Sequence, residues 1–222
     1  MISVIIPAHN EEKYIGETLD SIRCLNFKDL EIIVVCDSCR DKTYERAVKK
    51  SDKTFKVNFK CAPAARNFGA SKSKGETLIF LDADTSIVSR NYFDIINKYL
   101  EKNKSSKNRF VATSFFIPDN KKLKFLLFCF AKNLASLFGM ANGVIIIDAK
   151  TFNDLNGFNE KIFPVENGDL IKRARKIGRF KMFNLFVMTS MRRHDSVGLI
   201  NGIKFWLGEM FNKNKNEYGA VR

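Results

Sequence analysis

Hydrophobic and polar positions alternate in blocks along about the first eighty residues, in a pattern typical of strands and helices taken in turn. Short apolar runs that predict buried strands stand at Ile2–Ile6, Glu31–Val35, Phe55–Phe59 and Glu76–Leu81. Between them lie three segments that we expect to be helical: Glu11–Arg23, Asp41–Lys50 and Ala64–Lys74. This alternation predicts an α/β fold, with a parallel sheet and helices on both of its faces.

The polar segments that follow these strands should meet along one rim of the sheet. Ligands of open α/β sheets bind beyond the carboxyl ends of the strands. Pro7–Asn10, Cys36–Asp41 and Asp82–Thr85 each follow a predicted strand. We therefore expect these three segments to form the candidate site.

The second half of the chain has a less regular pattern. Strands are expected at Phe110–Ile117, at Gly143–Ile147 and, as one or two strands, at Phe180–Thr189, and a basic helix is expected at Asn167–Lys176. Two further stretches are rich in large apolar residues: Leu123–Ala141, which lysines interrupt, and the tail Gly198–Phe211. No internal repeat, low-complexity run or linker divides the 222 residues, so we expect one domain.

The charge balance changes the picture of possible partners. Lys and Arg number 38 against 24 Asp and Glu, a net charge of +14 that attracts nucleotides, nucleic acid or an anionic membrane. A nucleic-acid-binding module would gather its basic residues on one face beside a reading element. Here the basic residues are spread along the chain and acids gather at the expected rim, which disfavours that alternative.

Targeting signals and cysteines indicate the compartment. Met1–Pro7 leads straight into a strand, so no signal peptide is expected, and no uncharged apolar window reaches the ~18 residues of a membrane span. Five cysteines, an odd number, are expected to be reduced in the cytoplasm. Cys36 and Cys39 form a C-x-x-C pair, but the second pair that a zinc site needs is missing.

Two carboxylates at the end of the fourth predicted strand are the clearest candidate for chemistry. Asp82 and Asp84 are separated by the small Ala83, and hard oxygen donors so placed can hold Mg²⁺ or Mn²⁺. Such a cation keeps open positions for the phosphates of a nucleotide.

Other polar residues near the rim have two interpretations each. Arg66, at the start of a helix with small neighbours, suits a diphosphate or pairs with a nearby acid. Asp37 accepts a hydrogen bond from a base or ribose, or only turns the chain. Glu166 and Asp169 lie at the start of a predicted helix. One of them could act as a general base, or both could only complement the positive end of the helix dipole. Three residues after the last strand either meet phosphate and metal or are solvated: Arg192, Arg193 and His194.

Taken in order, these motifs resemble the family-two glycosyltransferases that use nucleotide-sugars and have a GT-A fold. The resemblance covers roughly residues 1–195 and rests on Val4–Glu12, Val35–Ser38, Ala64–Ala70, Gly75–Glu76, Phe80–Asp84, Asn142–Gly143, Gly157–Glu160, Glu166–Leu170 and Thr189–Arg193. It implies a Rossmann-like, mostly parallel central sheet flanked by helices, with a smaller acceptor-side half. The halves would be about 1–85 for the nucleotide-sugar and about 86–197 for the acceptor, followed by an amphipathic C-terminal helix at about 198–222.

The resemblance also implies roles for individual residues in an inverting, metal-dependent transfer from a UDP- or GDP-linked sugar. Donor contacts are implied for Pro7, Ala8, His9, Glu11, Asp37, Arg66, Asp82, Ala83, Arg192 and Arg193. The cation would be held by Asp84 with Asp82 and His194. The catalytic group would include Glu166, Asn167 and Asp169.

One position departs from the family pattern. The family usually has Glu-Asp where this chain has Glu166-Asn167, and the aspartate is generally the base, whereas an asparagine takes up no proton at neutral pH. Three explanations compete: Glu166 or Asp169 substitutes, the activity is lost or altered, or no base is required. The last would hold for a phosphate acceptor such as a polyprenyl phosphate, which is already anionic near neutrality.

The basic, Phe-rich second half fits a lipid acceptor or a growing glycan on a membrane. Segments flanked by Lys121, Lys122, Lys124 and Lys132 could lie on the cytoplasmic face of an anionic membrane, or pack as core or as a dimer contact. A nucleotidyltransferase making nucleotide-sugars is the nearest rival, but such enzymes usually begin with a glycine-rich loop, and Pro7–Asn10 contains no glycine. A noncatalytic sugar-binding homologue is the third alternative, because of Asn167.

Overall fold

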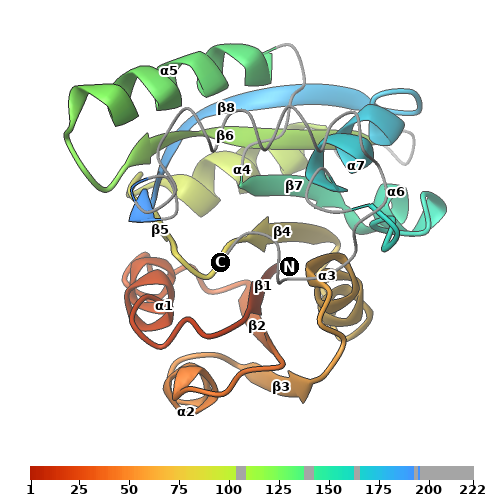
Figure 1. The fold of residues 1–222 in the computed structure, drawn as a ribbon. Helices are drawn as coiled ribbons and strands as arrows, with labels where there is room; N and C mark the ends of the chain where they lie inside the picture. Colours follow the sequence, from red (N-terminus) through yellow and green to blue (C-terminus); the bar gives the residue numbers. More distant parts are fainter. Residues whose placement is uncertain (104–108, 138–142, 163–165, 193–194, 196–222) are drawn as a thin grey trace.

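The computed structural model describes residues 1–103, 109–137, 143–162, 166–192 and 195. The strands are β1 (Ile2–Ala8), β2 (Leu30–Asp37), β3 (Lys53–Val57), β4 (Thr77–Leu81), β5 (Thr85–Ile87), β6 (Phe110–Pro118), β7 (Val144–Asp148) and β8 (Arg179–Thr189). The helices are α1 (Ile15–Arg23), α2 (Thr43–Val48), α3 (Ala62–Ser71), α4 (Tyr92–Lys102), α5 (Leu123–Leu137), α6 (Ala149–Asp154) and α7 (Glu166–Ala174). The strands form an eight-stranded, curled sheet in the order β3-β2-β1-β4-β7-β6-β8-β5 (Figure 1).

The first four strands are all parallel, as the alternating pattern predicts. β1 lies between β2 and β4 and β3 lies at the edge, so chain crossovers through α1, α2 and α3 connect them. All seven residues of β1 are buried, which matches the uninterrupted apolar runs of a sheet that is covered on both faces. Parallel strands end at one edge, and this edge is the predicted rim.

The second half of the sheet contains changes of direction that the sequence pattern did not mark. β7 is antiparallel to both β4 and β6, so β6 runs in the same direction as β4. β8 is parallel to β6, and the short β5 is antiparallel to β8. β5, α4 and α6 were not predicted at all.

Helices cover both faces of the sheet, and each face has its own core. On one face, Ile15 and Leu19 of α1 and Phe93 of α4 pack with β-strand residues in the largest apolar cluster. On the other face, residues of α6 and α7 such as Phe152 and Leu170 pack against β1 and β4. Figure 1 shows α1 and α3 on opposite sides of β1, so the predicted two-faced arrangement is confirmed.

Several predictions fall on residues that the structure does not describe. These are the amphipathic helix at 198–222 and the residues Asn142, Arg193 and His194. The division into a nucleotide-sugar half and an acceptor half also stays a prediction. Leu123–Ala141 becomes the helix α5 over its described part, and within that part only one side of the helix packs into the core.

Candidate functional site

Three loops meet at the carboxyl ends of β1, β2 and β4. Pro7 and Ala8 end β1 and are buried, and Ala8 pairs with Cys36 of β2, so the segments after both strands begin at the same level. After β4, the backbone turns at Asp82, whose carbonyl accepts from the Thr85 amide at 3.1 Å. The loops after β1, β2 and β4 therefore form the predicted rim, and they carry its polar residues.

The turn after β4 is held against α1. The Ala83 side chain is buried, and its carbonyl oxygen accepts a hydrogen bond from the Thr18 hydroxyl at 2.8 Å. Ala83 therefore anchors the turn while its two neighbours, Asp82 and Asp84, remain partly exposed.

A buried arginine joins two parts of the site. Arg66 Nη1 lies 2.6 Å from Glu166 Oε1 on α7, and Arg66 Nη2 lies 2.8 Å from Asp82 Oδ1 after β4. Arg66 is 5% exposed and Glu166 4% exposed, and the guanidinium also lies over the ring of Phe158, 5.4 Å from its centroid. The alternative that Arg66 pairs with a nearby acid is thus confirmed, and both acids belong to the candidate site.

Close packing of α3 on the sheet brings Arg66 to this position. A Cβ atom at Gly69 would lie 2.5 Å from Ile5 Cγ2 of β1, so only glycine permits this approach of α3 to β1. Ala65, beside Arg66, is fully buried. The small residues of this segment therefore serve to place the guanidinium at the end of the sheet.

Two buried oxygen atoms at the start of α7 have no hydrogen-bond partner among the described residues. Glu166 Oε2 and Asn167 Oδ1 are buried and have no partner within the described part of the chain. Burial raises the pKa of Glu166, although Arg66 opposes this effect. Burial disfavours the charge on Arg66, but Glu166 and Asp82 outweigh it and raise the pKa of Arg66. Since buried acceptors normally have donors, these two oxygens are suited to ligand hydroxyl groups.

A second arginine connects the loops after β1 and β4. Arg192 Nη2 lies 2.5 Å and 2.6 Å from the two carboxylate oxygens of Glu11 and 3.2 Å from Asp84 Oδ2. Its guanidinium stacks over the ring of Tyr14, 4.1 Å from the centroid. Burial alone would lower the pKa of Arg192, but Glu11 and then Asp84 raise it. In the described structure, Arg192 therefore places a positive charge beside Asp84, and its contact with a phosphate stays a prediction.

The carboxylate of Asp37 is used by the chain itself. Its Oδ1 accepts from the amides of Phe59 and Lys60 at 2.8 Å and 3.0 Å, and its Oδ2 accepts from the Cys61 amide at 2.9 Å. The side chain is fully buried, and its backbone carbonyl lies 2.6 Å from His9 Nδ1. Asp37 thus orders the loop before α3 and fixes the ring of His9, while its direct contact with a base stays a prediction.

Asp169 forms an ion pair within α7. Its Oδ2 lies 2.7 Å from Arg173 Nε, one helical turn away. Arg173 also donates to the carbonyls of Leu155 and Gly157, both at 2.8 Å. Asp169 therefore supports the loop before α7, and its role as a base stays a prediction that this pairing does not favour.

The acids after β4 suit a divalent cation. Asp82 Oδ2 faces Gly143, where an added Cβ atom would lie only 2.9 Å away, so glycine keeps space open beside this oxygen. The described residues hold no group of three or more His, Cys, Asp and Glu side chains that could bind a metal. Two carboxylates supply only part of the ligands that a hard cation takes, so a cation held by Asp82 and Asp84 stays a prediction and would need further oxygen ligands, such as those of a bound diphosphate.

Lys132 was grouped with exposed lysines in the sequence analysis, but the structure places it partly inside the protein. Lys132 of α5 is half-buried, with its ammonium 5.6 Å and 6.0 Å from the ring centroids of Phe128 and Phe116. Burial lowers its pKa, opposed by Cys129 and Asp82. Lys132 therefore differs from the exposed lysines with which the sequence analysis grouped it, and a lysine inside an apolar helix was the available signal.

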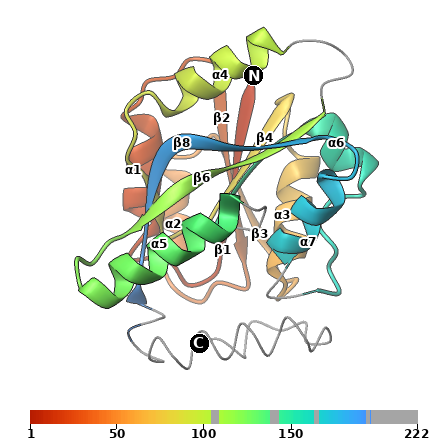
Figure 2. The same ribbon diagram turned by 90° about the horizontal axis from the view of Figure 1, so that it is seen from above.

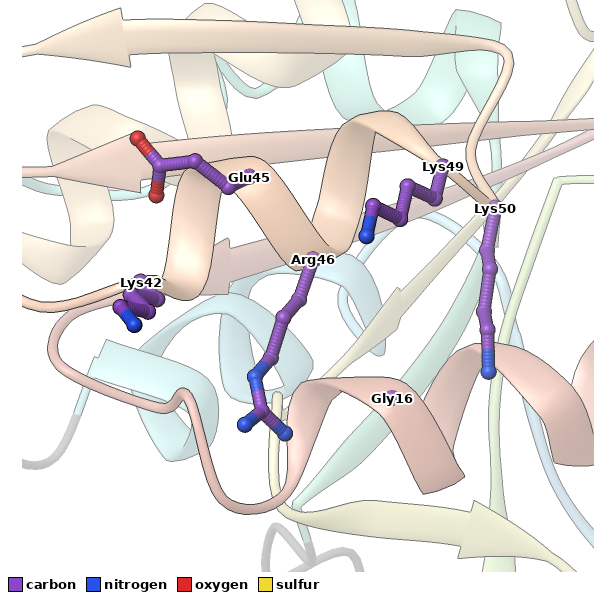
Figure 3. Close-up of a pocket in the computed structure, with 6 residues that line it drawn as sticks. All are labelled: Gly16, Lys42, Glu45, Arg46, Lys49 and Lys50. Carbon is purple, nitrogen blue, oxygen red and sulfur yellow. The ribbon is translucent and has the colours of Figure 1, made fainter.

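A separate hollow lies away from these residues, on the outside of α1 and α2. Its volume is about 410 Å³, and Figure 3 shows its lining residues Gly16, Lys42, Glu45, Arg46, Lys49 and Lys50. None of them is buried, and Lys50 is paired with Asp20 at 2.5 Å. This hollow is a mostly basic surface, and none of the predicted site residues lines it.

Comparison with known proteins agrees with this geometry. Residues 3–126 match the family model described as "Glycosyl transferase family 2". An uncharacterized glycosyltransferase of Rickettsia felis is 27% identical over 219 residues, covering 89% of this chain and 35% of that protein. The chain thus spans about a third of the length of that relative.

A second relative has a more specific name. The GalNAc(5)-diNAcBac-PP-undecaprenol beta-1,3-glucosyltransferase of Campylobacter jejuni is 35% identical over 95 residues, covering 40% of this chain and 31% of that protein.

Solved structures share the fold over nearly the whole chain. A mannosyltransferase from Pyrobaculum calidifontis in complex with GDP-Man and Mn²⁺ has a TM-score of 0.71 at 16% identity, covering 97% of this chain and 65% of that one. S. aureus TarS 1-349 in complex with UDP-GlcNAc has a TM-score of 0.69 at 18% identity, covering 97% and 68%. The architecture is therefore the GT-A fold that the sequence motifs imply.

Proposed function

Since the chain belongs to glycosyl transferase family 2, we propose that it transfers a hexose-like sugar from a nucleotide-diphosphate sugar to a membrane-associated acceptor, with inversion at the anomeric carbon. The observation that carries the proposal is the Arg66 bridge between Asp82 and Glu166, together with two buried oxygens at the start of α7 that have no partner among the described residues. This arrangement offers a positive charge, two carboxylates and oxygen atoms that can accept hydrogen bonds from hydroxyl groups. The family match favours this function over nucleotidyl transfer and nucleic-acid binding.

The donor would lie along the rim, with its diphosphate near the acids after β4. Structural neighbours in complex with UDP-GlcNAc and GDP-Man support a UDP- or GDP-linked sugar. In the proposal, the loops of His9 and Asp37 receive the base and ribose. Pro7, Ala8, Glu11, Ala83, Arg192 and Arg193 would complete the donor contacts.

We also propose that the reaction requires Mg²⁺ or Mn²⁺. Asp84 and Asp82 would hold the cation, with His194 as a further ligand, and a neighbour in complex with Mn²⁺ supports this assignment. A cation held there would supply Lewis-acid charge to the departing diphosphate. Arg192 would leave Asp84 and turn to a phosphate oxygen, because the cation replaces its charge beside that carboxylate.

In the transfer step, an acceptor oxygen forms a bond to the anomeric carbon while the bond from that carbon to the diphosphate oxygen breaks. The nucleoside diphosphate leaves with the bonding electrons. Glu166 Oε2 and Asn167 Oδ1 would accept hydrogen bonds from sugar hydroxyls and orient the anomeric carbon. Arg66 holds Glu166 and Asp82 in place for this task.

The acceptor in this proposal is a lipid-linked phosphate such as a polyprenyl phosphate. Asn167 offers no base, and a phosphate monoester needs none, because it is already anionic near neutrality. Lys132, whose pKa is affected by the charge of Asp82, would attract the charge of the phosphate. The name of the Campylobacter jejuni relative includes a polyprenyl-linked glycan and a β-1,3 linkage, so it supports a lipid-linked acceptor but one that reacts through a sugar hydroxyl; the phosphate acceptor rests on Asn167 alone. A lipid-linked acceptor of either kind would keep the protein at the membrane periphery.

A thermal-shift screen tests the donor proposal directly. UDP-, GDP-, dTDP- and CMP-linked nucleotides are added with and without Mn²⁺. One nucleotide is expected to stabilise the protein in the presence of the metal, by about 2.7 kcal/mol at a hundredfold excess over its Kd.

Two variants make the screen specific for the acids after β4. Asp84→Asn should remove the metal-dependent part of the stabilisation, whereas Asp94→Asn, an exposed residue of α4, should not change it. Absence of any stabilisation by all four nucleotides would contradict the donor site. Turnover of sugar-hydroxyl acceptors alone would contradict the phosphate acceptor.

A further inference from the structure

The outer side of α5 carries a continuous row of large apolar side chains. Six of them are strongly exposed: Leu123 (70%), Leu126 (45%), Leu127 (59%), Phe130 (68%), Leu134 (49%) and Leu137 (50%). At 3.6 residues per turn, they fall within an arc about 100° wide, and we call this set the α5 stripe. Figure 1 and Figure 2 both show α5 at the outside of the molecule, beside β6.

The opposite side of α5 already packs against the protein. Phe125, Cys129 and Ser136 are buried there, so the stripe is not needed for the core. A helix that is apolar on both sides requires a second apolar environment. The 15 described residues of α5 are fewer than a bilayer span needs, and none of the helices in the described ranges has the length and apolar character of a membrane span.

The charges around the stripe favour an anionic environment. The sequence of α5 contains no acidic residue. Lys121, Lys122 and Lys124 are exposed at its start, and the latter two share the exposed carboxylate of Asp195 at 3.1 Å each. Long lysine side chains of this kind extend toward lipid headgroups, with about 1 kcal/mol of attraction per basic residue at an anionic surface.

The stripe also lies at the correct end of the sheet. β6 runs in the same direction as β4, so the carboxyl end of β6 lies at the rim that carries Asp82. There the Asn133 side chain of α5 accepts from the Phe116 amide at 3.1 Å and donates to its carbonyl at 2.8 Å. A surface bound by the stripe would therefore lie beside the acceptor side of the site.

We propose that the α5 stripe lies in the headgroup region of an anionic membrane, with the adjoining lysines on lipid phosphates, so that the rim opens next to the bilayer. This inference rests on the proposed function in one respect, that the acceptor is lipid-linked. A second copy of the chain is a weaker occupant, because a stable interface uses roughly 20–30 residues from each partner. It would also bring no acid of α5 to match the lysines.

Vesicle flotation with the full chain tests the proposal without using activity. Wild-type protein is mixed with vesicles of phosphatidylcholine alone or with about a third phosphatidylglycerol. Binding is expected mainly to the anionic vesicles, with weaker binding at high salt. The double variant Leu127→Glu/Phe130→Glu is expected to lose at least tenfold in vesicle partitioning.

A matched control separates the stripe from general apolar exposure. Ile177→Glu changes a residue that is 40% exposed and lies outside α5, and it should bind vesicles as wild type does. Circular dichroism and nucleotide-dependent thermal shift confirm that each variant is folded. Because flotation needs no donor, vesicle binding without nucleotide binding would leave this inference standing while the proposed function fails.

Two results would overturn the proposal. Unchanged flotation of the double variant would assign membrane binding to another part of the chain, such as residues 196–222. A wild-type dimer that binds no vesicles and that the double variant converts to a monomer, measured by light scattering, would assign the stripe to a second copy.

Discussion

Arg66 and Glu166 are one hundred positions apart in the chain, yet Nη1 of the arginine lies 2.6 Å from Oε1 of the glutamate. Both side chains are at least nine-tenths buried, so the pair joins α3 of the first half to α7 of the second half inside the protein. Removal of one member of a buried ion pair leaves a charge without compensation, which costs more than the intact pair contributes.

Arg66→Gln is therefore expected to lower the free energy of unfolding by about 3–5 kcal/mol. Glu166→Gln should cost less, because Arg66 keeps its contact with Asp82. The double variant should lose less free energy of unfolding than the two single variants lose together. Urea denaturation of the wild type, the two single variants and the double variant measures this difference. Lys50→Gln, which breaks an exposed pair with Asp20, serves as the control and should cost at most about 1 kcal/mol. Additive losses at Arg66 and Glu166 would show that the pair is not coupled.

Arg192→Ala removes the positive charge that lies between Glu11 and Asp84. Without metal, the variant is expected to lose about 1–3 kcal/mol, because Glu11 is buried and loses a charged hydrogen-bond partner. Addition of Mn²⁺ should reduce this loss, since a cation at Asp84 replaces part of the missing charge. Thermal unfolding with and without Mn²⁺ measures the difference, with Arg40→Ala, an exposed arginine, as control. An equal loss in both conditions would count against a cation at Asp84.

Gly143→Ala places a methyl group 2.9 Å from Asp82 Oδ2 and so displaces that carboxylate. Because Asp82 is also a partner of the buried Arg66, the free energy of unfolding should fall, and donor affinity in the presence of Mn²⁺ should fall at least tenfold. Gly16→Ala is the matched control, because its methyl group meets nothing within 4 Å in α1 and should stabilise the helix by about 0.5–1 kcal/mol. Calorimetric titration with the donor compares the two. Unchanged affinity in Gly143→Ala would remove Asp82 Oδ2 from the proposed site.

Asn167→Asp restores the carboxylate that the family usually has at this position. With a polyprenyl phosphate acceptor, turnover should fall at least tenfold, because the new charge repels the phosphate. The exposed Asn153→Asp on α6 adds the same charge elsewhere and should leave turnover unchanged. Steady-state rates with phosphate and hydroxyl acceptors measure both effects. Faster transfer to a hydroxyl acceptor, with no loss on the phosphate, would indicate that the reaction needs a base after all.

Glu31 predicts a pH dependence of stability at the opposite end of the sheet. Burial would raise its pKa, but hydrogen bonds from Ser3, the Lys74 amide and Lys53 outweigh burial and lower it. Because the folded-state pKa lies below the unfolded value of about 4.5, its stabilisation is present above that pH and is lost as pH falls through the folded value. Glu31→Gln should therefore cost about 1–3 kcal/mol at pH 7 and much less at pH 3, measured by urea denaturation.

The exposed Glu17→Gln on α1 is the control for Glu31, and its effect should be small at both pH values. A loss in Glu31→Gln that is the same at pH 3 and pH 7 would show that the charge of Glu31 does not contribute.

The first half of the fold follows from its sequence because its strands are short, apolar and parallel. The apolar runs from Ile2 to Leu81 are joined by helical crossovers, which are right-handed between parallel strands, and the polar segments that follow the strands then meet at one rim. The second half does not follow in this way. The three residues of β5 are too few for a pattern, and the antiparallel insertion of β7 depends on pairing across the sheet.

Some features of the site could likewise be predicted from the sequence, and others could not. The acids after β4 and Arg66 were predicted because each follows from its local sequence and its place at the rim. The pairing of Arg192 with Glu11, by contrast, joins residues that lie 181 positions apart in the chain. Asp37 was predicted to lie at the rim. Its carboxylate accepts hydrogen bonds from backbone amides of the loop before α3, and the pattern of side chains along the sequence does not predict where those amides lie.

The pairing of β5 with β8 has a consequence for how the protein is made. Thr85 lies opposite Thr189, and the Ser190 amide donates to the Asp84 carbonyl at 3.2 Å, so the segment after the two aspartates is held by residues translated more than a hundred codons later. A nascent polypeptide that has emerged only as far as α5 already contains both aspartates but lacks Arg192 and Glu166. The contacts that Asp84 and Arg66 make with Arg192 and Glu166 are therefore complete only after the chain has been translated through Arg192.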